Sequence, residues 1–173
     1  SFDIHWQVLQ ESDWWPAVAV GIRDIAGTGI YGGEYIVATR HFGPDDRLAV
    51  TAGLGFGRLG ERGGFSNPFG LGERPRRDTG QGGTVNVDQF FRGNAAFFGG
   101  VEYQATDRLR LQVEYSSDLY SEEVSRGLMQ IESPWNFGLT YDIGRFGRLG
   151  AHYLYGTTFG ISLSFSNNPR RGA

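Results

Sequence analysis

The chain contains no cysteine and no lysine. Without cysteine it forms neither disulfide bonds nor thiolate metal sites. It also has no excess of positive charge, because 16 arginines stand against 19 acidic residues and the two signs are interspersed. Domains that bind nucleic acid carry a net basic stripe, so we expect no nucleic-acid partner. No apolar run approaches the roughly 20 residues of a transmembrane helix.

Glycine, by contrast, is abundant, at 28 of 173 residues. A glycine within a helix costs about 1 kcal/mol relative to alanine, so this composition excludes a mainly helical fold. The mean hydropathy of −0.34 is typical of a soluble protein. A transmembrane β-barrel has a similar average, however, because its apolar residues occupy only every second position of each strand.

Apolar and polar residues alternate through most of the chain, a pattern that predicts β-strands with one apolar face. The clearest example is 108–116, where Leu111 and Val113 share one face and Arg110 and Gln112 share the other. We predict roughly nine strands, each near the length that crosses a bilayer at a tilt. The predicted strands lie at about 2–10, 16–23, 31–40, 48–57, 95–105, 108–116, 135–142, 149–156 and 159–166.

The connections between these strands alternate in length. Two long loops are predicted, at about 58–93 and about 119–133. Short turns rich in Gly, Pro and Asp lie at 43–46, 106–107 and 144–147. Short turns at one end of the sheet and long loops at the other are typical of transmembrane barrels. We find no linker, so residues 1–173 are predicted to form a single β-barrel segment.

The alternation alone leaves open whether the apolar face points into a core or into lipid. The polar face carries glycine, serine and mixed charges, which suits a barrel interior, whereas a soluble barrel would expose many Lys and Glu residues. Aromatic residues near strand ends are typical of the girdles at membrane interfaces, although they also fill ordinary β cores. We therefore favour an all-β, antiparallel, up-and-down transmembrane β-barrel over a soluble barrel or sandwich. The aromatic residues concerned are Trp6, Trp14, Trp15, Tyr31, Tyr115, Trp135, Tyr141 and Tyr155.

Charged residues on the polar face are the first candidate site. In the strand at 31–40, Tyr35 and Thr39 fall on the predicted apolar face, and Glu34 and Arg40 fall on the polar face. Charged rings in a pore set its selectivity, whereas in a small filled barrel such charges pair and plug the interior. The residues expected to project into the lumen are Glu34, Arg40, Glu102, Arg110 and Glu114.

The first long loop, rich in arginine, is the second candidate site. Guanidinium groups bind carboxylates and phosphates through paired hydrogen bonds, so we expect this loop to contact an anionic polysaccharide or lipopolysaccharide. The alternative is a solvated loop whose charges neutralise one another, in part by pairing with the acidic second loop. The expected contact residues are Arg58, Arg62, Arg74, Arg76 and Arg77.

Other patterns that often carry chemistry have simpler explanations. Residues 55–60 match G-x-G-x-x-G, but nucleotide binding needs that motif between a parallel strand and a helix. His5, His41 and His152 lack the spacing of a zinc site. A serine on the last strand near His152 would still need a third group to orient the histidine as a base. We expect no cofactor, no metal and no catalysis.

Six segments of the chain, taken in order, are similar to segments of a known protein family. They are GTGIYGGEYIVATR at 27–40, GLGFGRLG at 53–60, FSNPF at 65–69, FGGVEY at 98–103, EYSSD at 114–118 and SPWNFG at 133–138. In this order they resemble the YjbH-like family of bacterial outer-membrane proteins linked to exopolysaccharide biosynthesis. The resemblance implies an outer-membrane β-barrel made with exopolysaccharide or capsule machinery, and it implies no established catalytic residue. Since family members are longer and no signal peptide is present, we expect a segment of a larger barrel.

We therefore expect a non-catalytic protein of the bacterial outer membrane that takes part in exopolysaccharide or capsule assembly or export. The expected partners are outer-membrane lipid and lipopolysaccharide, an anionic polysaccharide and other proteins of the export machinery. Two alternatives remain open at this point. One is a nonspecific diffusion pore, and the other is a soluble β-barrel that binds a small apolar ligand.

Overall fold

The computed structural model describes residues 3–24, 32–75, 87–144 and 147–165. Nine antiparallel strands form one sheet, and their order in the sheet is their order in the chain. They are β1 (Ile4–Leu9), β2 (Ala17–Arg23), β3 (Gly33–Phe42), β4 (Leu48–Gly57), β5 (Ala95–Gln104), β6 (Leu109–Tyr115), β7 (Trp135–Asp142), β8 (Arg148–Leu154) and β9 (Thr158–Ser164). The predicted all-β, antiparallel, nine-stranded arrangement is confirmed, with strand ends that differ by at most two residues.

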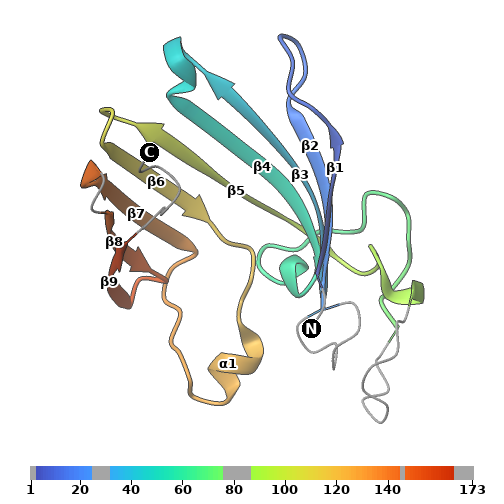
Figure 1. Ribbon diagram of the computed structural model, residues 1–173. Helices are drawn as coiled ribbons and strands as arrows, with labels where there is room; N and C mark the ends of the chain where they lie inside the picture. The colour runs from blue at the N-terminus through green and yellow to red at the C-terminus, as the bar shows by residue number, and fades with distance from the viewer. Residues whose placement is uncertain (1–2, 25–31, 76–86, 145–146, 166–173) are drawn as a thin grey trace.

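The sheet curves but does not close (Figure 1). Among the described residues, β1 pairs only with β2 and β9 pairs only with β8. A barrel closes only when its first and last strands hydrogen-bond to each other. The nine strands are therefore an open, curved sheet, and the prediction that they are a segment of a larger barrel stays a prediction.

The connections differ between the two ends of the sheet. The short-turn end carries the segments at 10–16, 43–47, 105–108 and 143–147, whereas the loop end carries 58–94, 116–134 and the tight turn at 155–157. The described parts of these connections include four short helices. They are η1 (Pro44–Asp46), η2 (Arg58–Gly60), η3 (Val87–Gln89) and α1 (Ser121–Ser125). No helix in the described part of the chain has the length and hydropathy needed to span a membrane.

One face of the sheet is apolar and largely exposed. Residues directly opposite each other in an antiparallel pair point to the same face, and this register places most of the aliphatic and aromatic residues of the nine strands together. Trp6 is 67% exposed, Phe97 is 64% exposed and Ile161 is 71% exposed. Among the described residues, no second layer covers most of this apolar face, which far exceeds the isolated exposed apolar residues of an ordinary protein surface.

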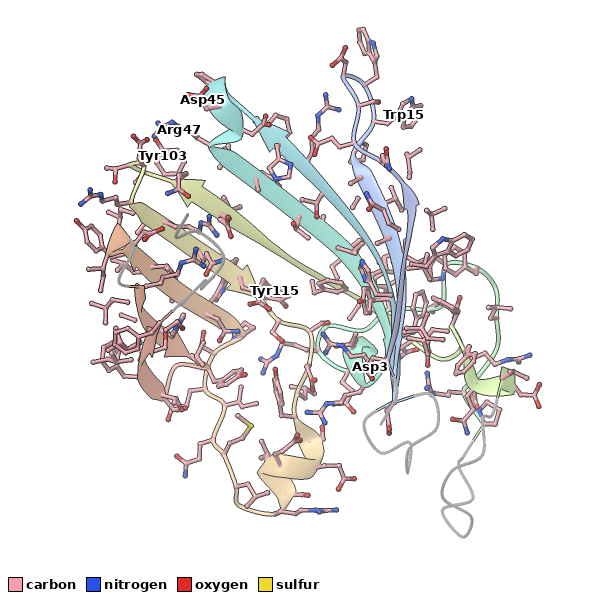
Figure 2. All side chains as sticks on the ribbon, viewed as in Figure 1. Asp3, Trp15, Asp45, Arg47, Tyr103 and Tyr115 are labelled. Carbon is pink, nitrogen blue, oxygen red and sulfur yellow. The ribbon has the colours of Figure 1, made fainter. Side chains whose placement is uncertain are left out.

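Aromatic residues lie at both ends of the apolar face. Figure 2 shows Tyr103 close to the short-turn end of the sheet, the end at which Trp15 also lies, and Tyr115 toward the loop end. The rings of Tyr115 and Trp135 meet edge to face, with centroids 5.2 Å apart. The two ends therefore match the places that aromatic girdles occupy in a sheet that faces lipid.

The opposite, polar face is concave and owes its shape partly to glycine. The ring of Tyr35 lies over Gly21, and the ring of Phe98 lies over Gly53, so that a Cβ atom at either glycine would overlap an aromatic ring. The two rings meet edge to face at 6.2 Å. Glycine at these positions lets the rings lie flat against the backbone, which is why both strands carry glycine among larger residues.

The structure places two predicted lumen residues on the other face. Glu34 pairs in register with Phe56, and Arg40 pairs with Val50, so both charged residues share the apolar face. Tyr35 and its alternate neighbours on β3 therefore face the polar side. The predicted faces of β3 are reversed, because the apolar and polar residues of this strand are too evenly mixed for alternation to decide.

Tertiary contacts explain how charges are tolerated there. Arg74 donates two hydrogen bonds to the carboxylate of Glu34, at 2.8 and 2.9 Å, and the backbone N–H of Phe91 donates a third at 3.0 Å. Glu34 is 1% exposed as a result. Arg40 donates to the backbone carbonyl groups of Asp13 and Trp14. Both charges are thus satisfied by chain segments outside β3.

Candidate functional site

The concave face carries a row of hydrogen-bonding side chains that lines a hollow of about 460 Å³. We call this space the central hollow. In register, Glu102 lies beside Gln112, and Glu114 lies beside Asn136. The polar side chains that line it are Thr39, His41, Thr51, Glu102, Gln112, Glu114, Asn136 and His152.

Some of these groups are already paired. The amide of Gln112 donates to Glu102 at 2.7 Å, and Nε of Arg110 lies 3.2 Å from the other oxygen of the same carboxylate. The carboxylate of Glu114 makes no hydrogen bond or ion pair with the side chain of any other described residue. An exposed ion pair such as that of Arg110 contributes little to stability, at most about 1 kcal/mol. The row is therefore better suited to contact a ligand than to hold the sheet together.

Two further hollows continue the central hollow along the strands. The loop-end hollow, of about 310 Å³, shares Phe98 and Glu114 with it. The turn-end hollow, of about 350 Å³, shares His41 and Glu102 with it. Together the three form a polar groove that runs along the concave face from one end of the sheet toward the other.

Arg58 spans the loop end of this groove. Its Nε donates to both carboxylate oxygens of Asp118, at 2.7 and 2.9 Å, and one terminal nitrogen donates to both oxygens of Glu123, at 2.9 and 3.0 Å. The guanidinium also lies 4.9 Å from the ring centroid of Tyr120. We call Arg58, Asp118 and Glu123 the Arg58 clamp. The clamp joins the two long connections, which are separate in the sequence.

Burial and pairing act in opposite directions within the clamp. Burial acts to lower the pKa of Arg58, but its hydrogen bonds to Glu123 and Asp118 outweigh this and raise the pKa. Burial likewise acts to raise the pKa of Glu123, and the hydrogen bond from Arg58 outweighs it and lowers that pKa. Burial, together with the hydrogen bond to Tyr155, raises the pKa of Tyr120. Arg58 and Glu123 therefore stay charged and the phenol of Tyr120 stays neutral near pH 7.

Backbone contacts reinforce the same crossing. The hydroxyl of Ser117 donates to the carbonyl of Leu59 at 2.6 Å, and the backbone N–H of Arg62 donates to the carbonyl of Ser117 at 3.0 Å. Leu59 packs directly over Gly55, where a Cβ atom would overlap it. The G-x-G-x-x-G match at 55–60 is thus a tight turn that folds back onto the sheet.

Of the five loop arginines, Arg58 and Arg74 line one hollow of about 430 Å³ at the loop end, but they bind different carboxylates. Arg58 lies over the concave face, whereas Arg74 pairs with Glu34 on the apolar face. The Nε of Arg62 is buried and has no hydrogen-bond partner among the described residues. Arg76 and Arg77 lie outside the described residues. Since Arg58 and Arg74 each bind carboxylates of this chain, their guanidinium groups are not open to an anionic ligand.

Of the five predicted lumen charges, Glu102, Arg110 and Glu114 line the groove on the concave face, and Glu34 and Arg40 do not. The sequence reasoning missed groove residues that carry no ionisable group. Among them are Phe98, Gln112 and Asn136. Period-two spacing places Gln112 on the face of Glu114, and Phe98 on the face of Glu102. Only the register between β5 and β6 shows that the two pairs of residues lie on one common face.

The comparisons with known proteins agree on one family. Residues 1–173 match the YjbH family, described as exopolysaccharide biosynthesis protein YbjH. The chain is 38% identical over 178 aligned residues to the uncharacterized lipoprotein YjbH of Escherichia coli (strain K12). That alignment covers 99% of this chain and 25% of the relative, so the chain spans about a quarter of the relative's length. No solved structure matches the chain. The match along its whole length, which confirms the resemblance found in its sequence, means that this chain belongs to the YjbH family.

Proposed function

We propose that this chain forms part of an outer-membrane β-barrel that takes part in exopolysaccharide or capsule assembly or export without catalysing a reaction. The observation that carries the proposal is the contrast between the two faces of the sheet. An exposed apolar face on all nine strands, backed by a polar concave groove, is the arrangement that a lipid-facing barrel wall requires. Its family is linked to exopolysaccharide biosynthesis.

The lipoprotein relative supports a place in the cell envelope. In the outer membrane, lipid and lipopolysaccharide would cover the apolar face, and the aromatic residues near its two ends would lie at the interfaces. A polysaccharide would contact the concave groove, and other proteins of the export machinery would complete the pathway. The two open edges, β1 and β9, need further strands for the wall to close.

The same geometry favours a binding role over a catalytic one. Ser162 lies 3.4 Å from Nε2 of His152. No described side chain hydrogen-bonds the other ring nitrogen of His152, and a serine nucleophile needs such an oriented base. The groove side chains are instead a mixture of hydroxyl, amide and carboxylate groups, which exchange hydrogen bonds with a polyhydroxylated ligand.

The experiment is deletion of the gene in a strain that secretes polysaccharide, followed by complementation with the natural full-length protein. We expect the protein in the outer-membrane fraction and expect deletion to reduce secreted polysaccharide. A second complementation lacks residues 61–91 but keeps the strands, and reduced secretion with normal membrane insertion would give this loop a role in export. Recovery of the protein as a soluble, monodisperse species without detergent, or unchanged secretion after gene deletion, would refute the proposal.

A diffusion pore is the other candidate, favoured by the charges that line the groove. Conductance of the full-length protein in planar bilayers separates the two functions. If it is a pore, Arg110→Ala and Glu114→Ala will change ion selectivity, and gene deletion will alter solute uptake and leave polysaccharide secretion unchanged.

A further inference from the structure

The charge of the central hollow indicates which kind of glycan the groove accepts. Glu102 and Glu114 both line it, and no arginine or lysine does. Three guanidinium groups line the adjoining hollows: Arg110 is paired with Glu102, Arg47 is paired with Asp107, and Arg23 lies 5.8 Å from the ring centroid of Tyr35. Glu114 faces the hollow without a partner among the described residues, so its full negative charge is available to a ligand. A uronic acid or phosphate group placed there would meet repulsion from both carboxylates.

Phe98 gives the groove an apolar platform at the point where the central and loop-end hollows meet. Its ring is held flat over Gly53 and is supported at its edge by Tyr35. The face of an aromatic ring is electronegative, and the C–H groups on one side of a sugar ring are weakly positive. A ring fixed in this position is therefore suited to stack against a pyranose. The carboxylate and amide groups beside the ring would accept hydrogen bonds from the sugar hydroxyl groups.

The length of the groove points to a chain of sugars. The three hollows share residues pairwise, through Phe98 and Glu114 at one junction and through His41 and Glu102 at the other. Hydrogen-bonding side chains occur along all three. A single small ligand would fill one hollow, whereas an extended oligosaccharide would occupy the series.

We propose that the concave groove binds a glycan strand whose sugars carry hydroxyl or amino groups and no acidic groups, with Phe98 as the stacking platform and Glu114 as the charge that rejects uronic acids. This inference rests on the proposed function for the identity of the polymer, and it departs from the anionic polysaccharide expected from the loop arginines. The groove thus determines which class of polysaccharide the protein accepts.

The test is calorimetric binding of sugar hexamers to the purified full-length protein in detergent. The probes are cellohexaose, mannohexaose, a chitosan hexamer and hexagalacturonate. We expect at least one of the first three to bind, and hexagalacturonate to bind at least tenfold more weakly. Hexagalacturonate binding as tightly as the best of the others, or no binding by any of the first three, would overturn the inference.

Variants assign the binding to the groove. Glu114→Gln keeps the size of the side chain and removes its charge. It should therefore reduce the ratio of affinities, the best-bound of the other hexamers over hexagalacturonate, by about tenfold. Phe98→Leu should lower the affinity for the hexamer that binds by about fivefold or more. Phe97→Leu is the matched control, because Phe97 is the adjacent residue and lies on the apolar face. Equal effects of Phe97→Leu and Phe98→Leu, or an unchanged preference in Glu114→Gln, would place binding outside this groove.

The two proposals fail in different ways. Absence of glycan binding in a protein that resides in the outer membrane and supports secretion would overturn only the groove inference. Absence from the outer membrane would overturn the proposed function whatever the binding result.

Discussion

The Nε atom of Arg58 lies 2.7 Å from Oδ2 of Asp118, sixty residues further along the chain. Both side chains are almost fully buried, at 12% and 6% exposure. Because one residue belongs to the connection after β4 and the other to the connection after β6, this ion pair fixes two long segments against each other over the concave face. The stability of the loop end therefore depends on a contact that strand pairing does not supply.

Replacing Arg58 by alanine should release that contact. The carboxylate of Asp118 would stay buried without its partner, and loss of one member of a buried pair costs about 3 kcal/mol. We expect faster amide hydrogen exchange in residues 117–125 with little change in β3 to β6. Arg126→Ala is the control, because Arg126 pairs with Glu122 in an exposed position and such pairs contribute at most about 1 kcal/mol. Equal protection losses in both variants would show that the clamp does not hold the loops.

Acid should open the clamp through Glu123. Its pKa is lowered below the ordinary value of 4.5, because the hydrogen bond from Arg58 outweighs burial. A carboxyl whose pKa is lower in the folded state adds stability above 4.5, and that stability is lost as the pH falls through the lowered pKa. Hydrogen exchange of residues 117–125, followed from pH 6 to pH 3, should show protection falling only below about 4.5. Glu123→Gln should flatten this pH dependence, and an unchanged profile in that variant would contradict the assignment.

The two faces of β6 should differ in their tolerance of charge. Leu111 lies on the apolar face, opposite Tyr103 and Leu139, whereas Gln112 lies on the concave face and donates to Glu102. In a lipid-facing wall, Leu111→Arg should cost about 2–4 kcal/mol in the free energy of unfolding from a bilayer. Gln112→Arg should be nearly neutral, since the new charge would face acidic groups. Similar costs at the two positions would refute the lipid-facing assignment.

The glycine beneath Phe98 should not tolerate a methyl group. A Cβ atom at Gly53 would overlap three atoms of the Phe98 ring, so Gly53→Ala should cost about 1–3 kcal/mol. Gly160 is the matched control on the concave face of β9, because nothing lies within 4 Å of the position of its Cβ atom. Gly160→Ala should be neutral or slightly stabilising. In the double variant with Phe98→Ala, Gly53→Ala should lose most of its effect, as a double-mutant cycle would measure.

The strands were predictable because alternation is a local property of the sequence. Residues 108–116 separate cleanly into an apolar and a polar set, and β6 (Leu109–Tyr115) occupies that segment with the predicted faces. Closure was not predictable in the same way, because it depends on pairing between strands at the two edges of the sheet. No local pattern states which strand, if any, lies beside β1 or β9.

The site was only partly predictable for a related reason. Alternation alone places Glu34 in the lumen, although the apolar and polar residues of 31–40 are too evenly mixed to decide the face. The structure places Glu34 on the apolar face, where a lone carboxylate is costly. Arg74, forty residues away, removes that cost by pairing with it, and no signal in the sequence links the two residues. Arg58 and Arg74 lie in one loop and line one hollow at the loop end, but they bind carboxylates from different parts of the chain, Asp118 and Glu34. Proximity in sequence could not reveal these partners.

The sequential order of the nine strands also bears on how this family diversifies. Every strand pairs with its neighbours in the chain, so a hairpin of two strands is a self-contained unit at either edge. Adding or removing such a unit changes the width of the sheet and leaves the direction and register of every remaining strand unchanged. Relatives of different length can therefore differ by whole hairpins, with the strands that they share keeping the same neighbours and the same register.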